Sequence, residues 1–217
     1  MGLDPALVAA VTLHRVHGTD AACSADDAVF QLSLAHVLLD GGFDGVATLA
    51  EAVAVLEREG PGGRVIAGGT DLLVQAKERG AVPAYVVSLK DVAELSALAY
   101  SDADGLAIGA RVALADVAAH PAVQRHYAAL ATGASLVGSF QIQNRGTVGG
   151  NVCNAAPSAD TAPPLLVAGA VARIHGPAGQ RGGCDVLGVD DTDHIVDRGA
   201  DDRVAAVALG LDDGDGL

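Results

Sequence analysis

An apolar strand, a pair of glycines and a helix follow one another directly between residues 64 and 79, and this order constrains the fold more than any other feature. Residues 64–67 form a short β-rich run, Gly68-Gly69-Thr70-Asp71 follows as a loop, and residues 72–79 are typical of a helix that Gly80 ends. Paired glycines allow close backbone approach and present successive N–H groups, which suits a diphosphate at a helix N-terminus. A tight turn with positive φ explains a single such pair equally well.

A second glycine segment, residues 146–151 (Gly-Thr-Val-Gly-Gly-Asn), lies within a stretch of weak periodicity, residues 133–162. Such a stretch is the best candidate for a functional loop. Neither segment has the spacing G-x-G-x-x-G or G-x-x-x-x-G-K-[ST], so neither a Rossmann dinucleotide site nor a P-loop is indicated. Two glycine segments together can clamp a pyrophosphate from both sides.

Alternating helical and β-rich segments surround these loops. Thr48 and Glu51 have the spacing of a capping box and predict a helix of about three turns. Further strands are expected at 85–89, 98–101, 106–110 and 171–174, and helices at 91–98 and 113–131, the last interrupted near His120-Pro121.

The composition narrows the class of protein. Half of the residues are hydrophobic, and 27 acidic against 13 basic side chains give a formal charge of −14, which disfavours nucleic-acid binding. The three cysteines contain no C-x-x-C pair, so a disulfide framework or an internal cluster is not indicated and a reducing cytoplasm fits best. The first residues do not resemble an export signal, and no apolar stretch is long enough to predict a membrane span.

The charge distribution divides the chain into three parts. Residues 1–42, 43–181 and 182–217 carry formal charges of −4, −2 and −8. We therefore predict an atypical N-terminal extension, an interpretable domain over 43–181, and an acidic tail that is disordered or frame-shifted.

Four segments carry a family resemblance. They are Val65-Ile66-Ala67-Gly68-Gly69-Thr70-Asp71-Leu72-Leu73, Val86-Val87-Ser88-Leu89, Ile142-Gln143-Asn144-Arg145-Gly146-Thr147-Val148-Gly149-Gly150-Asn151 and Ala155-Ala156-Pro157-Ser158-Ala159-Asp160-Thr161-Ala162-Pro163. In this order and spacing they resemble the FAD-binding (medium) subunit of the molybdenum hydroxylases, the family of xanthine dehydrogenase, carbon monoxide dehydrogenase and hydroxybenzoyl-CoA reductase. The resemblance covers residues 43–181. It implies an α+β fold, the two-lobed FAD-binding domain of the vanillyl-alcohol oxidase-like (PCMH) type, with lobes at about 43–100 and 101–181.

The resemblance also implies which residues bind FAD. The expected FAD-binding residues are Val65, Ile66, Ala67, Gly68, Gly69, Thr70, Asp71, Leu72, Thr147, Val148, Gly149, Gly150, Asn151 and Asp160. Asp160 has an alternative role as N-cap of the helix after Thr161. No catalytic residue and no metal site are expected, because the flavin ring carries the redox chemistry. Cys153 is interpreted as a small buried thiol.

The implied function is electron transfer within a complex. A molybdopterin-binding large subunit and a 2Fe-2S small subunit would be the partners, and FAD on this chain would pass electrons to NAD, oxygen or quinone. Family members continue into a further lobe that the acidic tail does not resemble. The alternative is therefore a non-catalytic truncated remnant or assembly protein that keeps the fold without retaining FAD. The substrate of the complex is not indicated.

Overall fold

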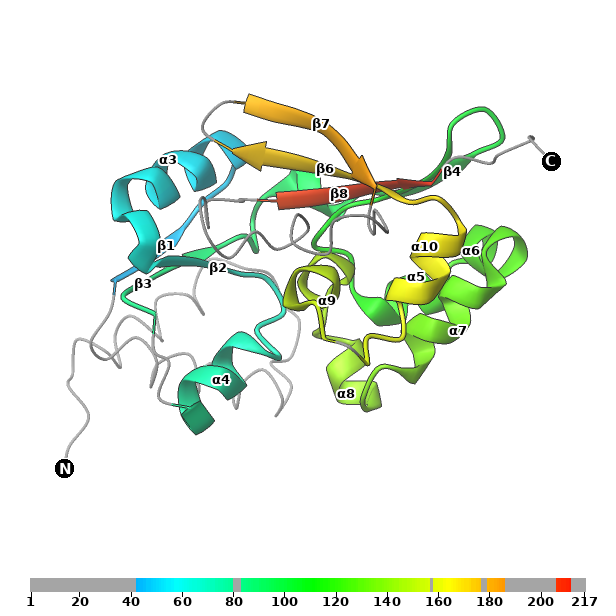
Figure 1. The fold of residues 1–217 in the computed structure, drawn as a ribbon, viewed down its shortest axis with the longest axis horizontal. Helices are drawn as coiled ribbons and strands as arrows, with labels where there is room; N and C mark the ends of the chain where they lie inside the picture. Colours follow the sequence, from blue (N-terminus) through cyan, green and yellow to red (C-terminus); the bar gives the residue numbers. More distant parts are fainter. Residues whose placement is uncertain (1–41, 80–82, 157, 177–178, 186–205, 212–217) are drawn as a thin grey trace, which may run out of the picture.

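The computed structural model describes residues 42–79, 83–156, 158–176, 179–185 and 206–211. The predictions for residues 1–41 and for most of the acidic tail lie outside these ranges. The described residues form an α+β fold with two sheets (Figure 1).

The first sheet is built from two successive β-α-β units. Its strands are parallel in the order β1-β3-β2, with register Val65↔Val87 between β2 and β3. The elements, in chain order, are β1 Gly42–Gly45, α3 Leu49–Glu59, β2 Gly63–Ile66, α4 Leu72–Arg79 and β3 Tyr85–Ser88. The predicted N-cap is confirmed, since Thr48 Oγ1 accepts from the Glu51 N–H at 3.2 Å. The return bond of the capping box differs by one residue, because Glu51 Oε2 accepts from the N–H of Ala47, which precedes the N-cap, at 2.8 Å.

Helices cover both faces of this sheet. Successive residues of a strand point to opposite faces. Val87 accordingly packs in a cluster with Leu56 of α3, whereas Val86 packs in another with Leu73 of α4. Burial on both faces explains why β3 carries two adjacent valines in place of an alternating pattern.

A surface cluster joins α3 to the outer strand β1. The Tyr85 hydroxyl donates to Asp44 Oδ2 at 2.7 Å, and Arg58 Nη2 donates to the same oxygen at 3.1 Å. These two donors, with the Tyr85 hydrogen bond as the larger cause, lower the pKa of the Asp44 carboxyl.

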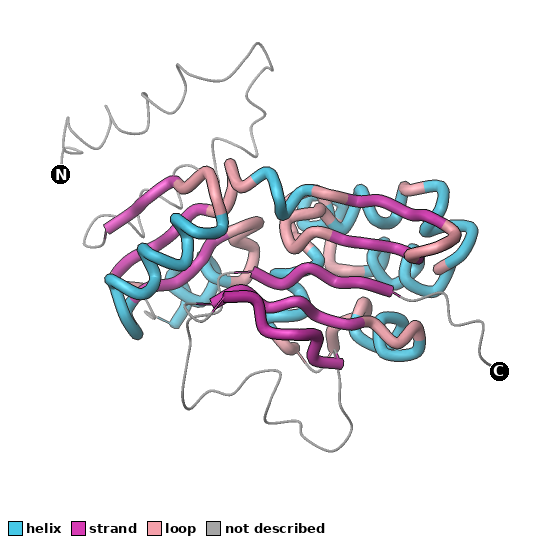
Figure 2. The backbone as a smooth tube through the Cα atoms, turned by 90° about the horizontal axis from the view of Figure 1, so that it is seen from above, coloured by secondary structure: helices cyan, strands magenta, loops and turns pink. Residues whose placement is uncertain are grey.

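The second sheet is antiparallel in the order β4-β5-β8-β6-β7. Its strands are β4 Leu98–Ser101, β5 Gly105–Ile108, β6 Val171–Gly176, β7 Gly179–Asp185 and β8 Ala206–Leu211. Six helices are described beside it, namely α5 Leu114–Ala119, α6 Pro121–His126, α7 Ala128–Leu136, α8 Phe140–Gln143, α9 Val148–Asn154 and α10 Ala162–Val167. All of these except α8 contribute to one core with β5 and β6, and Figures 1 and 2 show the helices gathered beside this sheet.

Three segments differ from the sequence predictions. Residues 91–98 form only a 3-10 turn, Ala93–Ser96, because the strand β4 begins at Leu98 and leaves no length for an α-helix. The stretch 133–162, expected to be a loop, contains α8 and α9. Ala206–Leu211, within the predicted tail, pairs between β5 and β6, because it is a short apolar run that can complete a sheet despite its acidic surroundings.

Candidate functional site

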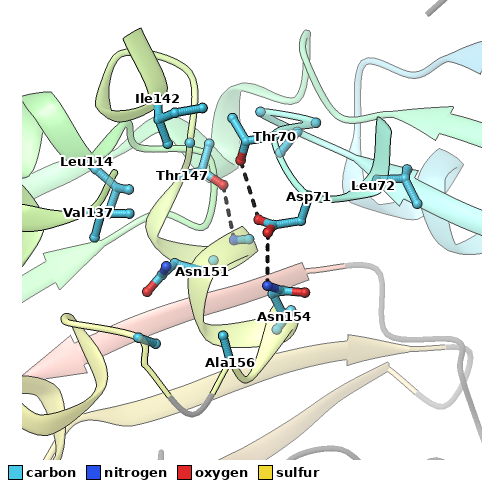
Figure 3. Close-up of a pocket in the computed structure, with 18 of the residues that line it drawn as sticks. Thr70, Asp71, Leu72, Leu114, Val137, Ile142, Thr147, Asn151, Asn154 and Ala156 are labelled. Atoms are coloured by element: carbon cyan, nitrogen blue, oxygen red, sulfur yellow. Dashed lines mark hydrogen bonds between the residues drawn. The ribbon is translucent and has the colours of Figure 1, made fainter. Parts of the chain in front are cut away.

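A cavity of about 750 Å³ lies where the loop after β2 faces α9 (Figure 3). The first side of its wall comes from the loop after β2 and the start of α4, and the second side from α9 and the segments before and after it. The position at the carboxyl end of a parallel strand is a usual place for a ligand in α/β sheets. The predicted residues that line it are Val65, Ile66, Ala67, Gly68, Gly69, Thr70, Asp71, Leu72, Thr147, Gly149, Gly150, Asn151 and Asp160.

Val148 is the predicted residue that does not line the cavity. Its side chain is fully buried in the core beneath the second sheet. Its N–H donates to the carbonyl of Val112 at 3.0 Å, so neither its side chain nor its N–H faces a ligand.

The first glycine segment leaves its backbone donors unused. Gly69 has φ 74°, a left-handed conformation that favours glycine, and a Cβ at Gly68 would overlap the carbonyl of Arg145, the residue just before the second glycine segment. Within the described part of the chain, no acceptor contacts the N–H groups of Gly68, Gly69 or Thr70. Successive unpaired N–H groups at a cavity wall suit an anionic ligand.

The second glycine segment uses its backbone donors within the protein, whereas the prediction assigned them to a ligand. The Gly149 N–H donates to the Ala110 carbonyl at 3.1 Å, and the Gly150 N–H donates to Thr147 Oγ1 at 3.1 Å as part of the N-cap of α9. These N–H groups therefore fix the position of α9. The prediction that backbone donors of both segments bind one pyrophosphate is wrong. Gly150 and Asn151 still line the cavity.

Side-chain amides connect α9 to α4 at one edge of the cavity. Asn154 Nδ2 donates to Asp71 Oδ1 at 3.0 Å, and Thr70 Oγ1 donates to Asp71 Oδ2 at 3.4 Å (Figure 3). Gln75 Nε2 donates to Asn154 Oδ1 at 3.3 Å. Both oxygens of Asp71 thus accept bonds within the protein. Gln75 and Asn154 are not among the predicted residues, because nothing in the sequence indicates that residues so far apart meet.

The other end of the cavity is apolar. Leu114, Val137 and Ile142 line it together with Gly138, which has φ 55°. A ligand that fills the whole cavity therefore needs a polar part near Gly68–Asp71 and an apolar part near α8.

Asp160 lies in the cavity wall and does not cap a helix. The N-cap of α10 is Thr161, and neither residue forms a side-chain capping bond. The reason lies in the sequence: Pro163 and Pro164 occupy the positions whose N–H groups a cap would bind, and proline has no N–H. Within the residues described, the Asp160 carboxylate has no hydrogen-bond donor.

Thr161 was not predicted as a site residue, but it contacts one. Its side chain is fully buried, and its hydroxyl donates to Asn151 Oδ1 at 2.5 Å. A threonine at a helix start that is followed by Ala-Pro-Pro cannot cap in the usual way, and this is the signal that could have identified it.

Cys153 is not the buried thiol that the sequence suggested. Its side chain is reachable by solvent and lines the cavity. The surrounding protein partly desolvates the thiol and thereby raises its pKa.

Among the residues that the structure describes, no group of three or more His, Cys, Asp or Glu side chains could hold a metal ion. No helix in the described ranges has the length and apolar character needed to cross a membrane.

Comparison with known proteins gives the family. Residues 44–182 match the family described as FAD binding domain in molybdopterin dehydrogenase. Over 135 residues the chain is 37% identical to a xanthine dehydrogenase FAD-binding subunit of Escherichia coli O157:H7, and over 134 residues it is 31% identical to the carbon monoxide dehydrogenase medium chain of Hydrogenophaga pseudoflava. Each alignment covers 62% of this chain and 46% of the relative, so the chain spans about half the length of these proteins.

Solved structures agree with this match. The fold superposes on carbon monoxide dehydrogenase from Hydrogenophaga pseudoflava with a TM-score of 0.71 at 26% identity, and on quinoline 2-oxidoreductase from Pseudomonas putida 86 with a TM-score of 0.69 at 26% identity. Both superpositions cover 79% of this chain and 58% of the other. The chain therefore belongs to the family of FAD-binding domains in molybdopterin dehydrogenases.

Proposed function

We propose that this chain binds FAD in the cavity and acts as the FAD-binding electron-transfer subunit of a molybdopterin-dependent hydroxylase or dehydrogenase. The observation that carries the proposal is that the N–H groups of Gly68, Gly69 and Thr70 have no acceptor among the described residues, while these three residues line the cavity at the carboxyl end of a parallel strand. Successive N–H groups of this kind suit the diphosphate of FAD. Family membership supports the same cofactor.

The cavity fits this ligand in size and in character. Its 750 Å³ lies within the range of about 300–1,000 Å³ that is usual for cofactor pockets. The N–H groups of the first glycine segment would hold the diphosphate, and Leu114, Val137 and Ile142 would contact apolar ring surface. Asn151 and Asp160 would bind hydroxyl, carbonyl or N–H groups. When bound, FAD supplies the redox chemistry, and the protein provides its position and surroundings.

The partners in this proposal are a molybdopterin-binding large subunit and a 2Fe-2S small subunit. Electrons would enter from the iron–sulfur clusters and leave to an acceptor such as NAD, oxygen or quinone. The names of the relatives support an assembly, since they are described as a subunit and as a medium chain. We place the complex in the cytoplasm, where a chain with three cysteines and no C-x-x-C pair stays reduced.

The test is equilibrium binding of FAD to the purified full chain, with the visible spectrum and the released flavin measured against protein. We expect stoichiometric FAD. No binding in excess FAD would overturn the proposal and favour the remnant that keeps the fold without the cofactor.

A matched pair of variants localises the site. Gly69→Ala and Gly60→Ala both place a Cβ on a residue with positive φ, 74° and 59°, at a cost of about 1–3 kcal/mol in folding free energy. Gly60 follows α3 and does not line the cavity. Weaker FAD binding in Gly69→Ala alone supports the proposed position, whereas equal affinities contradict it.

A further inference from the structure

The hydroxyl of Thr161 has an unusual use for a residue at the start of a helix. Threonine at an N-cap normally accepts a hydrogen bond from the second or third N–H of its helix. In α10 those positions are Pro163 and Pro164, so no such N–H exists. The Thr161 side chain is fully buried, and its hydroxyl donates to Asn151 Oδ1 across 2.5 Å.

This bond fixes which end of the Asn151 amide faces the cavity. A buried hydroxyl proton that finds no acceptor is costly, and Asn151 Oδ1 is the acceptor that the described residues provide. If the amide were turned over, its NH₂ group would meet the hydroxyl and the proton of Thr161 would lose this acceptor. The oxygen of the Asn151 amide is thus held toward Thr161.

The nitrogen end of the same amide remains available. Asn151 lines the cavity, as Figure 3 shows, and its backbone is fixed by the bond from its N–H to the Thr147 carbonyl at 2.9 Å. In the described part of the chain, Asn151 Nδ2 has no acceptor. An oriented donor at a cavity wall recognises an acceptor oxygen on a ligand.

We propose that Thr161 is a positioning residue, which holds the Asn151 amide so that Nδ2 donates to an acceptor oxygen of bound FAD. This inference rests on the proposed function, because the acceptor belongs to the ligand proposed above. Thr161 itself does not touch the ligand.

The experiment is a double-mutant cycle on the Kd of the full chain for FAD, measured by titration of flavin fluorescence. Thr161→Val keeps the shape of the side chain and removes the hydroxyl, and we expect it to raise Kd by about fivefold, the usual value of one hydrogen bond. Thr161→Ser keeps the hydroxyl, so Kd should stay within about twofold of the wild-type value. In an Asn151→Ala background, Thr161→Val should change Kd no further.

Asn151→Asp provides a second test that does not depend on how Thr161→Val folds. Aspartate still accepts from Thr161 but presents an oxygen to the cavity in place of the donor, so we expect a larger loss of FAD affinity than in Thr161→Val, with the melting temperature retained.

The outcomes distinguish a failure of the proposed FAD binding from a failure of the positioning role of Thr161. Absence of FAD binding in the wild type overturns the proposed function and this inference with it. If the wild type binds, an unchanged Kd in Thr161→Val, an equal effect of that substitution in the Asn151→Ala background, or wild-type affinity in Asn151→Asp each overturns the positioning role alone.

Discussion

Two adjacent glycines of α9 should respond to alanine in different ways, although the sequence gives them the same role. A Cβ at Gly149 would lie 2.6–2.8 Å from Cβ, O and Cα of Ala110, closer than side chains approach. Ala110 cannot retreat easily, because both of its neighbours donate backbone bonds, Gly109 to Ala97 at 2.7 Å and Arg111 to Leu95 at 2.9 Å. A Cβ at Gly150 would meet only Thr147 Oγ1, at 3.0 Å.

The expected magnitudes follow from these contacts. Overpacking at Gly149 costs about 1–3 kcal/mol, and loosening its bond to Ala110 and that of Val148 to Val112 costs about 1 kcal/mol each. A gain of about 1 kcal/mol from replacing glycine in a helix offsets part of this, so Gly149→Ala should lose about 2–4 kcal/mol of unfolding free energy. Gly150→Ala should be neutral or gain up to about 1 kcal/mol, because Glu51 already carries a Cβ at the equivalent position of the α3 capping box.

Thermal and urea unfolding of the two variants and the wild type checks this difference. For a chain of 217 residues, each kcal/mol shifts the melting temperature by about 2–4 °C, so the two variants should differ by at least about 4 °C. Melting temperatures that agree within about 1 °C would show that Gly149 is not needed for packing against Ala110.

Three further predictions concern the cavity and the surface. Gly150→Val should weaken FAD binding with little loss of melting temperature, because its side chain extends into the cavity; unchanged flavin content would contradict this. FAD should slow alkylation of Cys153 by iodoacetamide in a chain whose other two cysteines are serine, since the thiol lines the cavity; equal rates with and without FAD would contradict it. Hydrogen bonds from Tyr85 and, to a smaller extent, from Arg58 lower the pKa of Asp44 in the folded protein. The charged carboxylate therefore stabilises the fold at pH values above the ordinary carboxyl pKa, and this stabilisation is lost as the pH falls through the lowered pKa of the folded state. On acidification below about pH 4, the unfolding free energy of Tyr85→Phe should therefore fall by a smaller amount than that of the wild type. The difference between the two proteins should be less than about 1 kcal/mol, because the site is exposed, and identical acid profiles would show that Tyr85 does not lower the pKa of Asp44.

Local signals in the sequence predicted most of the first sheet and its helices. The capping box at Thr48 and Glu51, the strand before Gly68 and the turn at Asp104-Gly105 each depend on neighbouring residues, and the structure confirms all three elements. The interruption at His120-Pro121 is equally local, and α6 begins at this proline. Features of this kind can be predicted from the sequence because helix capping and turn formation depend on residues that are close together in the chain.

The sequence did not predict which distant strands and side chains pair with one another. Ala206–Leu211 lies within an acidic segment, and its place between β5 and β6 depends on partners that lie far from it in the sequence. The same holds for Asn154, whose bonds to Asp71 and Gln75 join residues about eighty positions apart. A short apolar run or a single amide gives no indication of which distant partner it will meet.

The two glycine segments show what a glycine pair in a sequence does and does not indicate. Both pairs mark a close backbone approach, and the sequence cannot tell whether a ligand or the protein makes it. At the second segment the protein makes it, because Ala110, in the loop that follows β5, accepts the N–H of Gly149. At the first segment the protein also makes one such approach, since the carbonyl of Arg145 lies where a Cβ of Gly68 would be. The N–H groups of Gly68 and Gly69, however, have no acceptor among the described residues, and both glycines line the cavity.

The packing of Gly149 in turn determines where the amides of α9 lie. Because Gly149 has no Cβ, α9 packs directly on the backbone of Ala110. Asn151 and Asn154, three residues apart, then project from one face of the helix. Asn151 lies beside Thr161, and Asn154 lies beside Asp71 at the edge of the first loop. In the proposed FAD site, the second glycine segment would therefore contribute through the side chains that it positions, and the backbone donors would come from the first.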